Sequence, residues 1–90
     1  MFAWDPRKAA SNVRKHGVGF SEASTVFLDP LAMTYPDPDH SVGETRFITF
    51  GSSSSGRILV VAHIEVGDQV RLISARKATK SEAHGYTKGS

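Results

Sequence analysis

The stretch Gln69–Tyr86, QVRLISARKATKSEAHGY, contains the signals that decide the fold. Its first half alternates with a period of two, which is typical of a strand with two distinct faces. Its second half contains Thr79-Lys80-Ser81-Glu82, the pattern of a capping box, in which the first and last side chains bond backbone N–H groups at a helix start. The sequence therefore predicts a strand that leads directly into a C-terminal helix.

Positive charge is concentrated in this part of the chain. The whole chain has a formal net charge of +2, whereas residues 69–90 alone have a balance of +4. Residues 29–45 contain acidic side chains and neither Lys nor Arg. This uneven distribution indicates a basic face suited to a polyanion and a separate acidic stretch. The cations of residues 69–90 are Arg71, Arg76, Lys77, Lys80 and Lys88.

Length and composition set further expectations. Ninety residues predict a single domain over positions 1–90, marginally stable unless a partner covers part of it. The absence of cysteine excludes disulfides and thiolate metal sites. The longest apolar run, Ile58–Ala62, is too short to cross a bilayer, and no leader-like segment opens the chain. We therefore expect a cytoplasmic protein without a membrane partner.

Two helices are predicted before the sheet. Asp5-Pro6 provides an N-cap followed by proline at the first helical position, so a helix should span Pro6–His16. Gly17 can adopt the left-handed conformation that ends helices. A second, short helix is expected from an N-cap at Ser21 through Phe27.

The remainder of the chain predicts a sheet and a last helix. Proline-rich, serine-rich and glycine-containing turns separate the strands, and Gly85 should keep the last helix short because glycine costs roughly 1 kcal/mol in a helix. The fold class is therefore α+β, with N-terminal helices packed on a roughly four-stranded, mainly antiparallel sheet. The expected strands are Leu31–Tyr35, Glu44–Phe50, Arg57–Glu65 and Gln69–Arg76.

His63 lies within the apolar run of the third expected strand, and its direction depends on the following turn. If Gly67-Asp68 forms a two-residue turn, His63 pairs with Leu72 and shares a side with Arg76. If the turn has three residues, the partner is Arg71. Sequence alone does not choose between these registers.

Several motifs in a fixed order resemble the BrnT family of bacterial toxins across nearly the whole chain. The resemblance implies a compact RelE-like fold and a ribonuclease activity that arrests growth. It also implies a partner, a BrnA-type antitoxin, which would block the toxin and contact operator DNA through its own DNA-binding half. The motifs are W-D-P-x-K at 4–8, N-x-x-K-H-G-V-x-F at 12–20, D-P-L at 29–31, E-x-R-F at 44–47 and I-S-A-R-x-A-T at 73–79.

RNA cleavage by transesterification needs no metal or other cofactor, but it needs proton transfer and cations around the phosphate. Arginine is suited to the second task because its planar fork binds two phosphate oxygens. Histidine is suited to the first because it titrates near neutral pH. The predicted catalytic residues are His63, Arg71, Arg76 and Lys80, with Arg46, Lys77 and Lys15 as RNA contacts. Glu65 and Glu82 are the alternative carboxylates, the second with a stronger structural role in the capping box.

A purely structural explanation is also open for each of these candidate residues. Single strand and helix cations are often only solvated, Lys15 suits a helix C-terminus, and His63 suits a half-buried position in the sheet. Asp37, Asp39, His40 and Glu44 could hold a metal, although a proline-punctuated acidic loop is more often solvated. A non-catalytic RNA-binding or regulatory protein is the alternative function, because it would have the same basic face.

Overall fold

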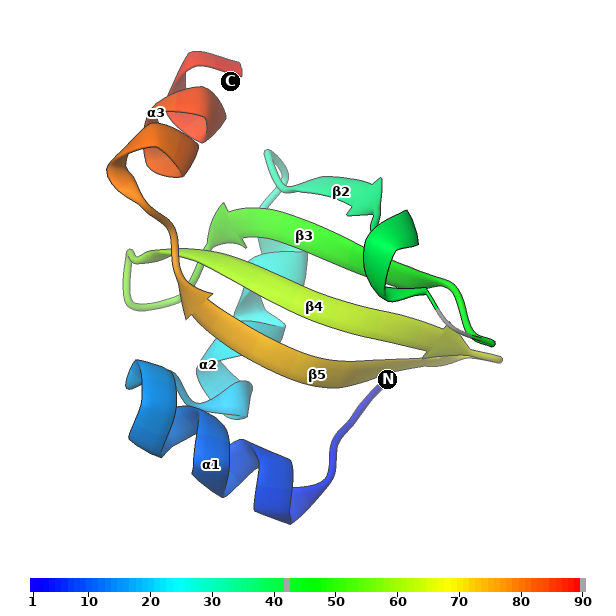
Figure 1. Ribbon diagram of the computed structural model, residues 1–90. Coiled ribbons are helices and arrows are strands. Elements are labelled where there is room, and N and C mark those ends of the chain that lie inside the picture. The colour runs from blue at the N-terminus through cyan, green and yellow to red at the C-terminus, as the bar shows by residue number, and fades with distance from the viewer. Residues whose placement is uncertain (42, 90) are drawn as a thin grey trace.

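The computed structural model describes residues 1–41 and 43–89. Ser90, the last residue of the predicted domain, lies outside the described residues. Within them, five strands form one sheet in the order β1-β5-β4-β3-β2 (Figure 1). All neighbouring strands are antiparallel except β1 and β5, which are parallel. The strands are β1 (Phe2–Ala3), β2 (Met33–Pro36), β3 (Arg46–Ser52), β4 (Ile58–Val66) and β5 (Gln69–Lys77).

The α+β fold is confirmed, with one strand more than the sequence predicted. The additional strand, β1, contains two residues, which is too short for a period of two to reveal. It is held on the edge of β5, where the Val70 N–H donates to the carbonyl of Met1 at 2.8 Å. The N-terminal segment thereby covers part of the open edge of the sheet.

The first helix, α1 (Pro6–His16), has the predicted bounds. Asp5 is its N-cap and accepts a hydrogen bond from the Arg7 N–H at 2.8 Å. Gly17 ends the helix with φ 67°, and its N–H donates to the carbonyl of Val13. The N-cap and the left-handed glycine therefore begin and end the helix as predicted.

The second helical segment differs from its prediction. It begins as α2 (Phe20–Ser24), with Gly19 rather than Ser21 at the N-cap, and continues as a 3-10 turn, η1 (Thr25–Leu28). Its start is set by packing, because Phe20 and Ala23 are buried against the sheet. Tertiary burial thus outweighs the capping preference of a serine.

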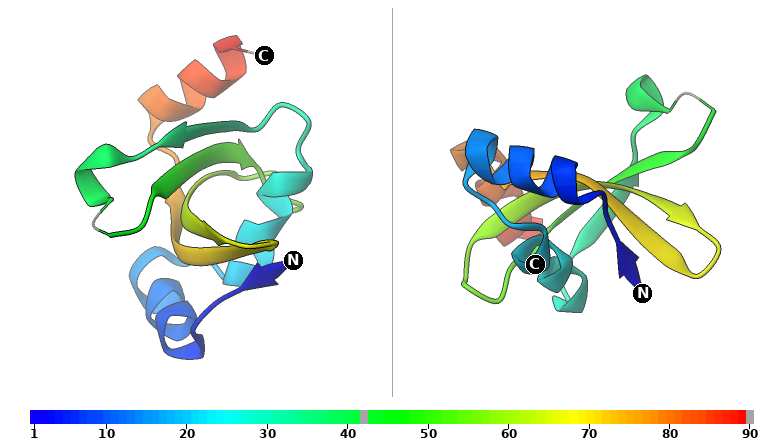
Figure 2. Two further views of the ribbon diagram at one scale, coloured as in Figure 1. Left: turned by 90° about the vertical axis from the view of Figure 1, so that its right-hand side faces the viewer. Right: turned by 90° about the horizontal axis from the view of Figure 1, so that it is seen from below.

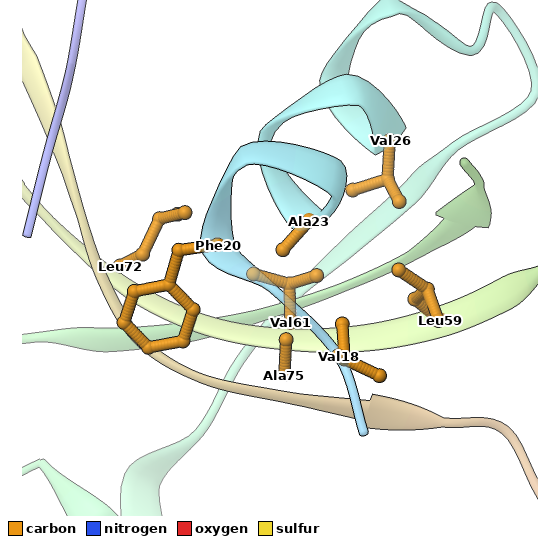
Figure 3. Close-up of a cluster of buried hydrophobic side chains, with 8 residues drawn as sticks. All are labelled: Val18, Phe20, Ala23, Val26, Leu59, Val61, Leu72 and Ala75. Atoms are coloured by element: carbon orange, nitrogen blue, oxygen red, sulfur yellow. The ribbon is translucent and has the colours of Figure 1, made fainter. Parts of the chain in front are cut away.

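Helix α1 lies along the outer edge of β5, whereas helix α2 and the η1 turn cover one face of the sheet, which we call the covered face (Figures 1 and 2). The core lies between them and the central strands, as Figure 3 shows. Full burial of each Val or Leu side chain contributes about 1.5–3 kcal/mol. The buried cluster contains Val18, Phe20, Ala23, Val26, Leu59, Val61, Leu72 and Ala75.

One buried polar side chain, Asn12, links α1 to β5. Its Nδ2 donates to the carbonyls of Val18 and Ala75, both at 2.8 Å. Its Oδ1 accepts from the Ala75 N–H at 3.0 Å. Asn12 therefore bonds both backbone groups of Ala75, as a neighbouring strand would do beyond the end of short β1.

A β-bulge in β5 changes the direction of its side chains. Gly67-Asp68 forms the two-residue turn, so His63 pairs with Leu72 as one register predicted. The pairing then shifts, because Ala62 pairs with Ser74 and leaves Ile73 as the extra residue. His63 therefore does not share a face with Arg76, contrary to the prediction from uninterrupted alternation.

The last helix, α3 (Lys80–Gly89), has ten residues and continues through Gly85. The capping box is present, since the Thr79 N–H donates to Glu82 Oε1 at 2.8 Å and the Glu82 N–H donates to Thr79 Oγ1 at 3.1 Å. Tyr86 is buried, and its hydroxyl donates to the carboxylate of Asp29. This contact secures α3 across the sheet at its β2 end.

Candidate nucleic-acid interface

The face of the sheet opposite α2 carries two adjoining hollows that together form what we call the groove. Figure 1 shows this face, with the short η2 turn (Pro38–His40) in front of it. The hollows have volumes of about 250 and 240 Å³, and both are lined by His40 and Arg46. The first is also lined by Asp5, Lys8, Glu44, Ile64, Arg71, Leu72 and Ile73. The second is also lined by Asp37, Ile48, Val60, Ala62, Ser74 and Arg76.

Arg46 occupies the centre of this groove at the start of β3. Its Nε is buried and has no hydrogen-bond partner among the described residues. A guanidinium donor buried without an acceptor is costly, and an anion would satisfy it. This makes Arg46 the strongest phosphate-binding candidate of the groove.

His40 and Asp37 form a pair on the rim of the same groove. His40 Nδ1 lies 2.8 Å from Asp37 Oδ2. The His40 side chain is 65% exposed, whereas that of Asp37 is 13% exposed. A carboxylate that holds Nδ1–H fixes the imidazole tautomer and leaves Nε2 to accept a proton. The pair therefore has the arrangement of an oriented general base.

Hydrogen bonds tie the η2 turn to the first residue of β3. The Asp37 N–H donates to the Arg46 carbonyl at 2.7 Å, and the Arg46 N–H donates to Ser41 Oγ at 2.9 Å. Ser41 Oγ in turn donates to the Asp37 carbonyl at 2.7 Å. Because of this closed ring of bonds, the His40–Asp37 pair and the Arg46 guanidinium are positioned by the same backbone.

Arg76 lies at the other end of the groove and is already paired. Its Nη1 and Nη2 donate to the two oxygens of Glu82 at 2.7 and 2.9 Å. These bonds, with smaller help from Thr79, lower the pKa of Glu82 to about 2. The same carboxylate raises the pKa of Arg76. Arg76 is therefore a permanent cation held by one acidic partner.

The other predicted cations are more dispersed. Arg71 lines the first hollow, together with Lys8 of α1. Lys15 lines a third hollow of about 250 Å³ beside α1, which Lys8 also borders. Lys77 pairs with Leu59 and so is directed toward the covered face, away from the groove. Lys80 is exposed in the first turn of α3.

His63, the predicted proton-transfer residue, lies inside the covered face instead. It is 1% exposed, and its ring contacts Phe27 edge-on and Phe47 in a stacked arrangement. Its Nε2 is 2.7 Å from Thr49 Oγ1. Burial lowers its pKa, and the charge of Glu65 opposes this only partly. The structure therefore separates His63 from the groove that contains Arg46 and Arg76.

Three further features of the sequence are the acidic stretch of residues 37–44, the serine-rich turn of residues 51–56 and Trp4. No group of three His, Asp or Glu side chains is arranged to hold a metal ion in residues 1–41 and 43–89. The serine turn is a structural cluster, in which Ser53 and Ser55 donate to Glu22 and Arg57 pairs with the same carboxylate. Trp4 packs edge-on against Phe20, with 6.0 Å between the ring centroids.

Sequence reasoning treated His40 and Asp37 only as metal ligands. Their spacing of three residues was visible, but it indicates an oriented pair only when a turn brings position i next to i+3. Pro36 and Pro38, which flank Asp37, were the available signal for such a turn.

Comparisons with known proteins agree with this architecture. Residues 4–82 match the family model described as the ribonuclease toxin, BrnT, of type II toxin–antitoxin systems. The fold and this match place the protein in the class of toxins of type II toxin–antitoxin systems. More particularly, the chain belongs to the BrnT toxin family, as its sequence motifs indicated.

A solved structure of the same family supports the fold. The chain is similar to the ribonuclease toxin BrnT of Brucella abortus, known from a crystal structure at 1.1 Å resolution. The TM-score is 0.70 at 25% sequence identity, and the match covers 89% of this chain and 99% of that one. The search of curated proteins gave no match. None of the helices in the described part of the chain is long and apolar enough to cross a membrane.

Proposed function

We propose that this protein is a cytoplasmic endoribonuclease toxin that cleaves RNA by metal-independent transesterification in the groove. One observation carries the proposal: His40, which Asp37 orients, lines the same two hollows as Arg46, whose Nε has no hydrogen-bond partner among the described residues. An oriented base beside a cation that lacks an acceptor is what attack on a phosphodiester requires.

In this mechanism His40 Nε2 takes the proton of the RNA 2′-hydroxyl, which then attacks the adjacent phosphorus. The negative charge of the phosphorane develops beside Arg46, whose planar fork can bind two oxygens, and beside Arg76, whose fork is held by Glu82 and which contributes through its charge. The 5′-oxygen leaves and takes a proton from water, and these cations reduce the charge that it must carry. We assign Arg71 to a neighbouring phosphate of the same strand.

The other predicted contacts take supporting parts in the proposal. Lys15, beside the third hollow, and Lys80, at the start of α3, would attract more distant phosphates by charge rather than by defined geometry. Lys77 lies on the covered face and would contribute only through its long-range field. His63 is proposed as a core residue and not as the base, because it is buried on the covered face.

We further propose that a BrnA-type antitoxin neutralises the toxin by covering the groove. The family is defined by type II toxin–antitoxin systems, and such systems include a protein partner. An acidic, amphipathic antitoxin segment would pair with the arginines and exclude RNA at the same time. Operator DNA would be contacted only through the antitoxin.

Cleavage of a defined single-stranded RNA by the purified protein in EDTA tests the proposal. We expect cleavage that survives chelation and stops when one equivalent of antitoxin is added. If a well-folded protein leaves RNA intact with and without Mg²⁺, in the absence and presence of ribosomes, the endoribonuclease assignment is wrong. RNA binding without cleavage would then support the alternative of a non-catalytic RNA-binding partner.

A further inference from the structure

A separate hollow of about 330 Å³ lies between the edge of the sheet and α3. It is lined by side chains of two strands and by one turn of the helix, and we call it the aromatic hollow. Its volume exceeds that of either part of the groove. The lining residues are Met33 and Tyr35 of β2, Phe50 of β3, and Glu82, Gly85 and Tyr86 of α3.

Two rings give the aromatic hollow an exposed π surface. Tyr35 is 50% exposed, and its ring centroid lies 6.1 Å from that of Phe50, with an interplanar angle of 63°. Aromatic side chains exposed in this way are the usual platforms on which bases of single-stranded nucleic acids stack. The third ring, Tyr86, is buried and fixed by its bond to Asp29, so it forms a rigid wall.

Gly85 borders the aromatic hollow without a side chain. It lies inside α3, where glycine is less favourable than alanine by roughly 1 kcal/mol. A Cβ built on Gly85 would meet no atom within 4 Å outside its own helix and neighbours. The helix therefore presents free space, rather than a packed contact, at this point. A larger side chain here would enter the hollow without disturbing the core.

The aromatic hollow is continuous with the groove through the Arg76–Glu82 pair. Arg76 lines the groove, and the carboxylate that holds it lines the hollow. The strands give the same continuity, because Phe50 follows Ile48 on one face of β3, and Ile48 lines the groove. A strand of RNA with a phosphate in the groove would place an adjoining base over the hollow.

The chemistry of the lining selects a base rather than a phosphate. The Glu82 carboxylate repels anions, whereas its Oε2, which accepts from Arg76, retains capacity for an N–H donor of a base. The apolar side chains of Met33 and Phe50 favour a flat, weakly hydrated group. From these observations we propose that the aromatic hollow binds one unstacked nucleobase of the RNA and sets the base preference next to the cleaved phosphate.

This inference rests on the proposed function, but binding can test it without cleavage. The probes are a single-stranded RNA octamer and the same octamer without bases, each titrated against the folded protein. We expect the parent protein to bind the intact octamer at least about tenfold more tightly than the abasic one, the lower range for one stacked base. In Tyr35→Ala and Gly85→Leu proteins this difference should shrink by about tenfold, while affinity for the abasic octamer stays unchanged.

Two control variants make the test specific. Gly85→Ala improves helix propensity but adds only one carbon, and Leu28→Ala changes an exposed apolar residue, 81% exposed, that does not line the aromatic hollow. Both should bind like the parent. Because Gly85→Leu should strengthen α3, loss of the difference in that variant does not arise from unfolding.

Cleavage of a random-sequence RNA pool adds a second reading. If the parent cleaves, the Tyr35→Ala and Gly85→Leu proteins should cleave with a weaker preference for particular bases next to the cleaved phosphate. An unchanged profile together with an unchanged intact-to-abasic ratio overturns the inference while leaving the proposed ribonuclease in place. If the parent does not cleave RNA but the two variants still show the reduced ratio of intact to abasic affinity, the ribonuclease assignment is wrong and the base site is retained. Loss of antitoxin binding in these variants, with RNA binding unaltered, would overturn the inference and assign the hollow to the protein partner.

Discussion

The guanidinium of Arg76 and the carboxylate of Glu82 face each other fork to fork, with N–O distances of 2.7 and 2.9 Å. The same carboxylate accepts the Thr79 N–H in the capping box. A cation of the proposed RNA site is therefore fixed by a residue of the capping box at the start of α3. Changes at Glu82 act on the stability of α3 and on the charge of the groove together.

Replacement of Glu82 by glutamine should destabilise the fold most at neutral pH. Because the folded pKa is about 2 against an ordinary 4.5, its stabilising contribution is present above about pH 4.5 and is lost as the pH falls toward 2. Since the pair is partly exposed, we expect a loss of about 1 kcal/mol at pH 7. In urea unfolding, the free energies of unfolding of the parent and of Glu82→Gln should converge as the pH falls. Asp39→Asn, an exposed control, should follow the parent, and a pH-independent gap for Glu82→Gln would contradict this reading.

The parent protein should become less stable at mildly acidic pH, and replacement of His63 by leucine should abolish this pH dependence. Burial lowers the folded pKa of His63 from its ordinary 6.5, so the unfolded chain binds the proton first. The parent protein should therefore lose unfolding free energy as pH falls below about 6.5, relative to His63→Leu. Chemical denaturation between pH 7.5 and 5 measures the difference. A constant gap would mean that His63 is not held neutral in the core.

Replacement of Asn12 by alanine should destabilise the fold by about 2–4 kcal/mol, because the buried backbone groups that its side chain bonds would be left without a hydrogen-bond partner. Two carbonyls and the Ala75 N–H would lose their partner. The neighbouring Val13→Ala, at a position that is 50% exposed, should cost far less and serves as the control. Equal unfolding free energies for the two variants would show that the link between α1 and β5 is unimportant.

Replacement of Arg46 by alanine should weaken RNA binding in a salt-dependent way. Loss of one phosphate contact to a single strand should reduce the slope of log affinity against log salt by about 0.7. Arg14→Ala removes an equal charge from the exposed surface of α1 and should leave the slope nearly unchanged. Fluorescence titrations at several salt concentrations measure both slopes. Identical slopes for the two variants would place the phosphate outside the groove.

Local signals in the sequence predicted the elements well where the chain itself determines the backbone. The bounds of α1 follow from Asp5, Pro6 and Gly17, and the capping box of α3 follows from Thr79 and Glu82. These signals act within one turn of helix. They need no knowledge of distant contacts.

The candidate site depended on features that local patterns do not contain. Uninterrupted alternation in β5 placed His63 beside Arg76, but the bulge at Ile73 moved them to opposite faces. The cations Arg46, Arg71 and Arg76 were identified from residue type and strand position. The pairing of His40 with Asp37 was not, because it depends on a turn whose position is fixed by the backbone of Arg46.

The chemistry of the RNA ends tests the central claim most directly. RNA incubated with the protein in EDTA should acquire 2′,3′-cyclic phosphate and 5′-hydroxyl ends. His40→Ala should slow this reaction by about 10²-fold or more, the usual contribution of a positioned base. His84→Ala, which removes an exposed histidine of α3, should act at the parent rate. Cleavage that EDTA abolishes, or parent-like cleavage by a folded His40→Ala protein, would contradict the account.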